Sequence, residues 1–205
     1  MLDKKGFDLW AGQYDEEVRS SDETDTYPFA GYEKVISAIF LKIAETPDTK
    51  VLDLGFGTGR LTCELYKKGL AIYGQDFSKK MVELAQEKMP AAHLYEGDFS
   101  EGLVKELRTE SFDYIVATYS LHHLTDQKKV KLLRSLLERL NEHGKILIGD
   151  VMFRTREDMD GCRKETGDAW DEEEIYIVTD ELKNEFPDLV FTPVSFCAGI
   201  LEIDR

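Results

Sequence analysis

A glycine-rich stretch, VLDLGFGTGR at residues 51–60, constrains the fold of this 205-residue chain more than any other segment. Gly55, Gly57 and Gly59 alternate with other residues directly after an apolar run that contains one acid, Asp53. Glycine tolerates positive φ angles and lets a ligand approach the backbone closely. The segment therefore consists of an apolar run, a glycine-rich turn and a helical pattern. This order predicts the first strand, loop and helix of an α/β sheet.

Short apolar or β-branched runs alternate with helical patterns through the rest of the chain. We predict strands at 50–55, 71–76, 92–97, 112–118 and 145–151. We predict helices at 3–19, 31–45, 61–68, 79–88, 101–108, 127–141 and 155–166. This alternation favours a doubly wound, mostly parallel α/β sheet that helices cover on both faces. Two alternating runs near the C-terminus, VFTPVSF and GILEID, predict an antiparallel edge hairpin and bring the sheet to seven strands.

The charge balance excludes some classes of partner. Asp and Glu number 41 against 26 Lys and Arg, which gives a formal charge of -15. Such a surface should repel nucleic acid and anionic lipid, so we expect neither as a partner. No apolar run approaches the roughly 20 residues that span a bilayer, the first residues lack the apolar core of a signal peptide, and the three cysteines form no CxxC pair. A cytoplasmic protein is expected, and the sequence does not indicate its oligomeric state.

The spacing of the glycines argues against a dinucleotide site. The dinucleotide fingerprint requires G-x-G-x-x-G, whereas this chain has G-x-G-x-G followed by Arg60. A carboxylate at Asp53 disfavours a pyrophosphate and suits an ammonium or sulfonium group. Asp76 and Asp98 follow the second and third predicted strands, so all three acids should meet at one sheet edge. A lone Asp in such a place is often a helix cap, and capping stays an alternative for each.

These residues resemble the class I S-adenosylmethionine-dependent methyltransferases over residues 50–151. VLDLGFGTG is similar to the first motif of that family, in which an acid and the glycine backbone hold the amino acid end of the cofactor. Phe56 departs from the small residue often found between the first two glycines. QDFSKKMVELA is similar to the second motif, whose acid, here Asp76, accepts hydrogen bonds from the ribose hydroxyls. The resemblance implies a Rossmann-like fold, S-adenosyl-L-methionine as cofactor and S-adenosyl-L-homocysteine as product.

The resemblance also implies a cofactor site that continues along the sheet edge. Asp98 in EGDF would accept from the adenine amino group, with Phe99 beside the ring. Thr118 and Tyr119 in VATYSLHHL would close over the adenosyl group, and Tyr14 would approach the cofactor's carboxylate. The predicted cofactor-binding residues are Tyr14, Asp53, Gly55, Phe56, Gly57, Gly59, Asp76, Phe77, Asp98, Phe99, Thr118 and Tyr119.

The methyl acceptor is expected to be a small molecule. His122, which follows the fourth predicted strand, is the candidate catalytic base, and a base is needed only if the acceptor must lose a proton early. A loop with one packed and one exposed ring is the alternative for the pair His122 and His123. The predicted substrate-binding residues are Tyr27, Tyr32, Tyr119 and His122, and DAWDEEEIYIV, residues 168–178, is a candidate second wall.

We expect one domain over residues 1–205. Within it, residues 1–48 form N-terminal helices and a lid, 50–151 the cofactor-binding core, and 152–205 an acceptor-side insertion and the C-terminal strands. Three other functions stay open: a module that binds the cofactor without catalysis, a nicotinamide-dependent oxidoreductase and a metal-assisted methyltransferase. The last would need a carboxylate cluster beside the acceptor. Asp150 is an isolated acid, so no metal is predicted.

Overall fold

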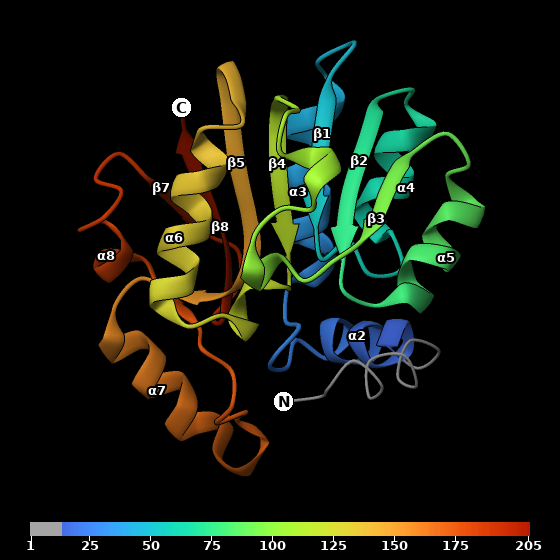
Figure 1. The fold of residues 1–205 in the computed structure, drawn as a ribbon. Coiled ribbons are helices and arrows are strands. Elements are labelled where there is room, and N and C mark those ends of the chain that lie inside the picture. Colours follow the sequence, from blue (N-terminus) through green and yellow to red (C-terminus); the bar gives the residue numbers. More distant parts are fainter. Residues whose placement is uncertain (1–13) are drawn as a thin grey trace.

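The fold is built around one mixed β-sheet. The computed structural model describes residues 14–205, and its strands follow the order β3-β2-β1-β4-β5-β8-β7, with the short β6 paired to β5 off this path (Figure 1). The parallel strands are β1 Lys50–Leu54, β2 Ala71–Asp76, β3 His93–Glu96, β4 Phe112–Thr118, β5 Leu140–Phe153 and β6 Ile177–Val178. The antiparallel strands are β7 Val190–Pro193 and β8 Ala198–Asp204. The predicted fold class is confirmed.

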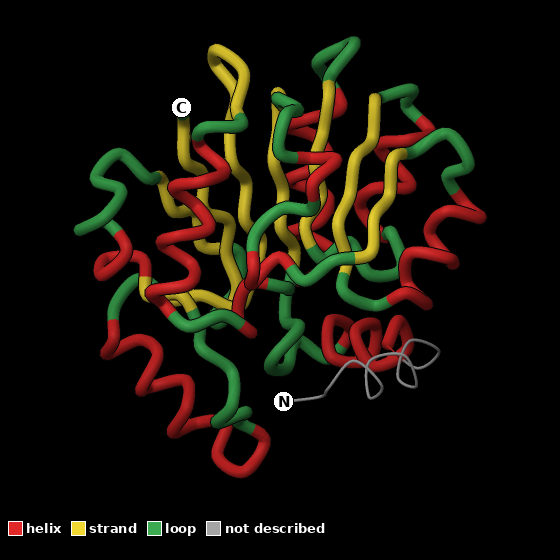
Figure 2. Tube along the Cα trace, in the orientation of Figure 1, coloured by secondary structure: helices red, strands yellow, loops and turns green. Residues whose placement is uncertain are grey.

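Helices cover both faces of the sheet, as the tube view shows (Figure 2). The α-helices are α2 Tyr14–Glu23, α3 Tyr32–Ala44, α4 Arg60–Lys67, α5 Lys79–Lys88, α6 Asp126–Leu137, α7 Arg156–Thr166 and α8 Thr179–Leu182. Single 3₁₀ turns are η1 Phe99–Glu101, η2 Lys105–Leu107, η3 Leu121–His123 and η4 Gly167–Ala169. Among the described helices, none combines the length and the apolar character that crossing a membrane requires.

Two hydrophobic cores follow from the alternation of side chains along the central strands. Val51 on β1 packs into the core under α3 and α4, whereas its neighbour Leu52 packs into the core under α6. Successive side chains of a strand point to opposite faces, so a strand apolar at every position is buried on both sides. In Figure 1, α6 lies in front of the sheet and α3 behind it.

Two of the predicted helices were wrong. The predicted helix at 101–108 is replaced by η1 and η2, because Gly102 between them has φ 101° and the Gln75 side chain bonds to the backbone of Gly102 and Val104. The helix predicted over 127–141 ends at Leu137, because Leu140 already pairs with Phe112 at the start of β5.

The predicted antiparallel C-terminal hairpin is confirmed. It lies at one edge of the sheet, where β8 pairs with β5 and β7 forms the outermost strand. At the other end of the chain, the part of the predicted helix 3–19 that precedes residue 14 lies outside the described residues, and α2 continues to Glu23.

Two helical leucines test the core under α6. Leu133 is 0% exposed and Leu41 on α3 is 59% exposed. Leu133→Ala should lower the free energy of unfolding by about 2–5 kcal/mol, since it removes buried methyl groups and leaves a cavity. Leu41→Ala should change it by less than about 0.5 kcal/mol. Urea unfolding monitored by circular dichroism measures both, and equal effects would contradict this assignment of the core.

Candidate functional site

A cleft opens at the carboxyl ends of the parallel strands. It encloses about 330 Å³ and runs from the loop after β1 to η3 and the segment 171–174. Ligands of open α/β sheets bind at this edge, because the strand order reverses there and leaves a crevice. Ten of the predicted site residues line the cleft: Tyr32, Gly55, Phe56, Gly57, Asp76, Phe77, Phe99, Thr118, Tyr119 and His122.

The glycine loop presents its backbone to the cleft. Gly57 has φ 53°, and a Cβ atom placed there would meet nothing within 4 Å. A Cβ on Gly55, by contrast, would lie 2.6 Å from the Cβ of Ser120, so that glycine permits close packing between the loops after β1 and β4. Phe56 is buried against β2 at Gly74, where a Cβ would lie 2.6 Å from the ring. Gly74 on β2 thus leaves room for the Phe56 ring, which a side chain at position 74 would displace.

Asp76 joins the loops after β1 and β2. Its Oδ2 accepts from the backbone N–H of Gly57 at 2.9 Å, and its Oδ1 accepts from that of Ser78 at 2.8 Å. The side chain is 3% exposed and lines the cleft. The carboxylate therefore fixes the shape of the glycine loop and also presents negative charge to the cleft.

Asp53 lies beneath the glycine loop and outside the cleft lining. Its Oδ2 accepts from the Thr62 hydroxyl at 2.9 Å, and its Oδ1 has no hydrogen-bond partner among the described residues. Burial, together with the nearby charge of Asp76, raises the pKa of Asp53 to about 7. A buried carboxylate with one oxygen unused favours a cation close above it.

Three further predicted site residues, Gly59, Asp98 and Tyr27, lie outside the cleft lining, and the side chain of Tyr14, the first residue of α2, lies outside the described part of the chain. Gly59 is the left-handed N-cap residue of α4. Asp98 is exposed and caps η1 by accepting from Ser100 N–H at 2.8 Å. Tyr27 stacks on Trp170 at 5.2 Å between ring centroids, and its hydroxyl accepts from the backbone N–H of Asp171.

His122 is oriented by a buried carboxylate. Asp150 on β5 accepts from His122 Nδ1 at 2.6 Å and from the backbone N–H groups of Leu121 and Val151 at 3.1 and 2.8 Å. Burial works to lower the pKa of His122, but the charge of Asp150 and the hydrogen bond to it raise that pKa above its ordinary value. The tautomer with the proton on Nδ1 leaves the Nε2 lone pair facing away from Asp150.

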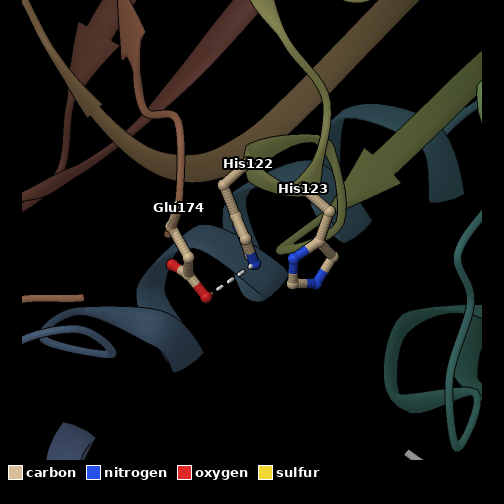
Figure 3. A group of neighbouring side chains, drawn as sticks. All are labelled: His122, His123 and Glu174. Atoms are coloured by element: carbon tan, nitrogen blue, oxygen red, sulfur yellow. Dashed lines mark ion pairs between the residues drawn. The ribbon is translucent and has the colours of Figure 1, made fainter. Parts of the chain in front are cut away.

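Glu174 lies opposite that lone pair, with its Oε1 3.5 Å from His122 Nε2 (Figure 3). The backbone N–H of Ile175 donates to the carbonyl of His122 at 2.8 Å, and the ammonium of the buried Lys129 donates to the Ile175 carbonyl at 2.5 Å. Burial raises the pKa of Glu174. Residues 168–178 are the segment that the sequence predicts as a second wall, but no sequence signal distinguishes Glu174 from the other acids of that segment.

Two observations indicate that an adenosyl cofactor fits this edge of the sheet. The backbone at Gly57 is open to the cleft, and the unpartnered oxygen of Asp53 lies beneath the same loop. Both suit a ligand that brings a positive charge close to bare backbone. The far end of the cleft holds the polar groups of His122 and Glu174.

Comparison with known proteins identifies the family of this chain. A family model described as a methyltransferase domain matches residues 51–144. An uncharacterized methyltransferase of Oceanobacillus iheyensis is 33% identical over 187 residues, which cover 88% of this chain and 84% of that protein. An uncharacterized methyltransferase of Anoxybacillus flavithermus is 38% identical over 151 residues, covering 74% and 68%.

Solved structures share the fold at low sequence identity. The magnesium protoporphyrin IX methyltransferase of Synechocystis PCC 6803 with bound S-adenosylhomocysteine matches with a TM-score of 0.68 and 18% identity, over 86% of this chain and 84% of that chain. A DhpI complex with S-adenosylhomocysteine matches with a TM-score of 0.67 and 16% identity, over 98% and 94%. The family model and the methyltransferase of Oceanobacillus iheyensis, not the fold, argue against the oxidoreductase alternative. The chain belongs to the class I S-adenosylmethionine-dependent methyltransferases.

Proposed function

We propose that the protein methylates a small-molecule acceptor that binds between the cofactor and the residues His122 and Glu174. The observation that carries the proposal is the continuity of one cleft of about 330 Å³ from the glycine loop to these two side chains. That volume lies within the range of small-molecule sites, roughly 300–1,000 Å³. The magnesium protoporphyrin IX methyltransferase, by its name, also methylates a small molecule.

The cofactor half of the cleft would hold and orient S-adenosylmethionine. Gly57 and its neighbours would contact the amino acid end, Asp76 the ribose hydroxyls, and Phe99 the adenine ring, with Asp98 at the adenine amino group. S-adenosylmethionine, when bound, supplies a methyl group on an already activated sulfonium. The protein's own part is then to align the acceptor with that methyl group and to exclude water. Tyr32 and Tyr119, whose rings lie 4.7 Å apart between centroids, would close this region.

In the acceptor half, His122 would take the proton that leaves the acceptor. Asp150 holds its Nδ1–H, so Nε2 is the atom available for proton uptake. Asp171, Glu173 and Glu174 bring negative charge to this wall. Arg60 is the only Lys or Arg in the described lining, and it is paired with Glu33 at 2.8 Å. We therefore favour a neutral or cationic acceptor.

Asp76→Ala tests the cofactor half. The variant loses charge-assisted hydrogen bonds to the ribose and the support of Gly57, so the affinity for S-adenosylhomocysteine should fall by about 100-fold. Calorimetry measures it. Glu87→Ala is the matched control, because it removes the same charge from an exposed position on α5. Unchanged affinity in a folded Asp76→Ala protein would remove Asp76 from the site.

The pH dependence of cofactor binding tests Asp53. Its pKa of about 7 belongs to the ligand-free protein. A cationic ligand favours the ionised carboxylate and lowers that pKa, so affinity should be full above pH 7 and decline as the pH falls through about 7. Calorimetry of S-adenosylmethionine binding between pH 5.5 and 7 should show this decline, and Asp53→Asn should abolish it. An equal decline in the variant would assign the effect to another group.

His122→Ala tests the acceptor half. Loss of a general base typically lowers turnover by about 100- to 10,000-fold. Formation of S-adenosylhomocysteine should be measured with a panel of small amines, phenols and carboxylic acids, using the acceptor that gives turnover. The affinity for S-adenosylmethionine should stay unchanged, and the exposed His143→Ala is the control. Full turnover in the His122→Ala variant would exclude the base assignment.

A further inference from the structure

Three potential metal ligands converge on the acceptor side of the cleft. His122, His123 and Glu174 each offer one ligand atom, and these atoms all lie within 4.8 Å of one another. Figure 3 shows both rings directed from η3 toward the same space, which Glu174 enters from the opposite wall. His122 and His123 are neighbours in sequence, but Glu174 belongs to a separate segment, so only the fold assembles this set.

The spacing within the set suits a tetrahedral ion. Two ligand atoms that are each about 2.1 Å from a tetrahedral zinc ion lie about 3.4 Å apart. His122 Nε2 and Glu174 Oε1 are separated by 3.5 Å. No two of the three ligand atoms lie more than 4.8 Å apart, so no pair exceeds the tetrahedral value by more than about 1.4 Å, which rotation of the His123 and Glu174 side chains can close.

The surroundings of these ligands are those of a supported metal site. A metal-bound histidine usually donates its other ring N–H to a carboxylate, which fixes the ring and its tautomer. Asp150 accepts in this way from His122 Nδ1 at 2.6 Å and is itself held by two backbone N–H groups. Glu174 is supported similarly, since its Oε2 accepts from the Tyr176 hydroxyl at 2.7 Å while Oε1 faces His122.

We propose that His122, His123 and Glu174 bind a divalent transition-metal ion of the zinc class, with the remaining coordination position open to the cleft. Two imidazoles and one carboxylate are a donor set that zinc accepts in sites with an open position. Hard ions such as Mg²⁺ prefer oxygen ligands, so they should bind weakly here.

The bound ion would regulate methyl transfer. This step rests on the proposed function, in which His122 Nε2 accepts a proton. Nε2 has one lone pair, so metal coordination and proton uptake exclude each other at that atom. The metal-loaded protein should therefore be inhibited, and a chelator should restore turnover.

Titration calorimetry with Zn²⁺ and absorption spectroscopy with Co²⁺, both on the full chain, test the site without reference to activity. We expect one Zn²⁺ per chain, and at least about 100-fold weaker binding in Glu174→Gln and in His123→Gln, because each removes a direct ligand. Asp150→Asn should weaken binding by about 10- to 100-fold through the orientation of His122. The Co²⁺ spectrum should lack thiolate bands, which excludes the cysteines as ligands.

Glu172→Gln is the matched control. It removes the same charge from the same segment, but the Glu172 side chain is 64% exposed and paired with Arg163. It should leave Zn²⁺ affinity unchanged, and S-adenosylhomocysteine binding checks that each variant is folded. The site is overturned if folded Glu174→Gln and His123→Gln bind Zn²⁺ as tightly as the parent, or if Glu172→Gln weakens binding equally. Zinc binding that depends on both ligands but raises turnover would uphold the site and refute the proton-accepting role of His122.

Discussion

The end of the cleft that holds His122 depends on the buried carboxylate of Asp150. It accepts three hydrogen bonds, from the N–H groups of Leu121 and Val151 and from His122 Nδ1, and it is 1% exposed. A carboxylate so far from water is stable only when its oxygens are satisfied in this way. These bonds hold η3 against β5 and orient His122, so removing the charge would release both the turn and the imidazole.

Further hydrogen bonds attach the segment that contains Glu174 to η3 and α6. The carbonyl of His122 accepts from Ile175 N–H, and Lys129 donates to the carbonyls of Ile175 and Leu124. Burial lowers the pKa of Lys129, whose ammonium takes the place of water for these two carbonyls. The pairing of β6 with β5 also attaches this segment to the sheet. Glu174 thereby faces His122 without being part of a long regular element.

The glycine-loop end of the cleft is held in the same way, by a carboxylate at another strand end. Asp76 accepts from the N–H groups of Gly57 and Ser78, so one carboxylate sets the loops after β1 and β2 relative to each other. Asp53 differs, since one of its oxygens has no partner among the described residues. The first carboxylate fixes the shape of the loop, whereas the second is buried beside it with one oxygen unused. The cleft therefore combines a preformed backbone surface at the glycine loop with oriented side chains at η3.

The sequence by itself determined the elements whose signals are local. The apolar run before Gly55, the helical pattern of α6 and the acid that ends β2 each depend on neighbouring residues, and they predicted the sheet, its helices and the loop that lines the cleft. Local sequence patterns failed to predict the structure where contacts between distant residues determine it. The Gln75 side chain bonds to the backbone of Gly102, and Leu140 pairs with Phe112. Only the tertiary structure placed Asp150 beside His122 and Glu174 opposite His122. Hydrogen bonds between a strand, a turn and a distant loop produce no periodic pattern in the sequence, so the sequence could not predict this arrangement.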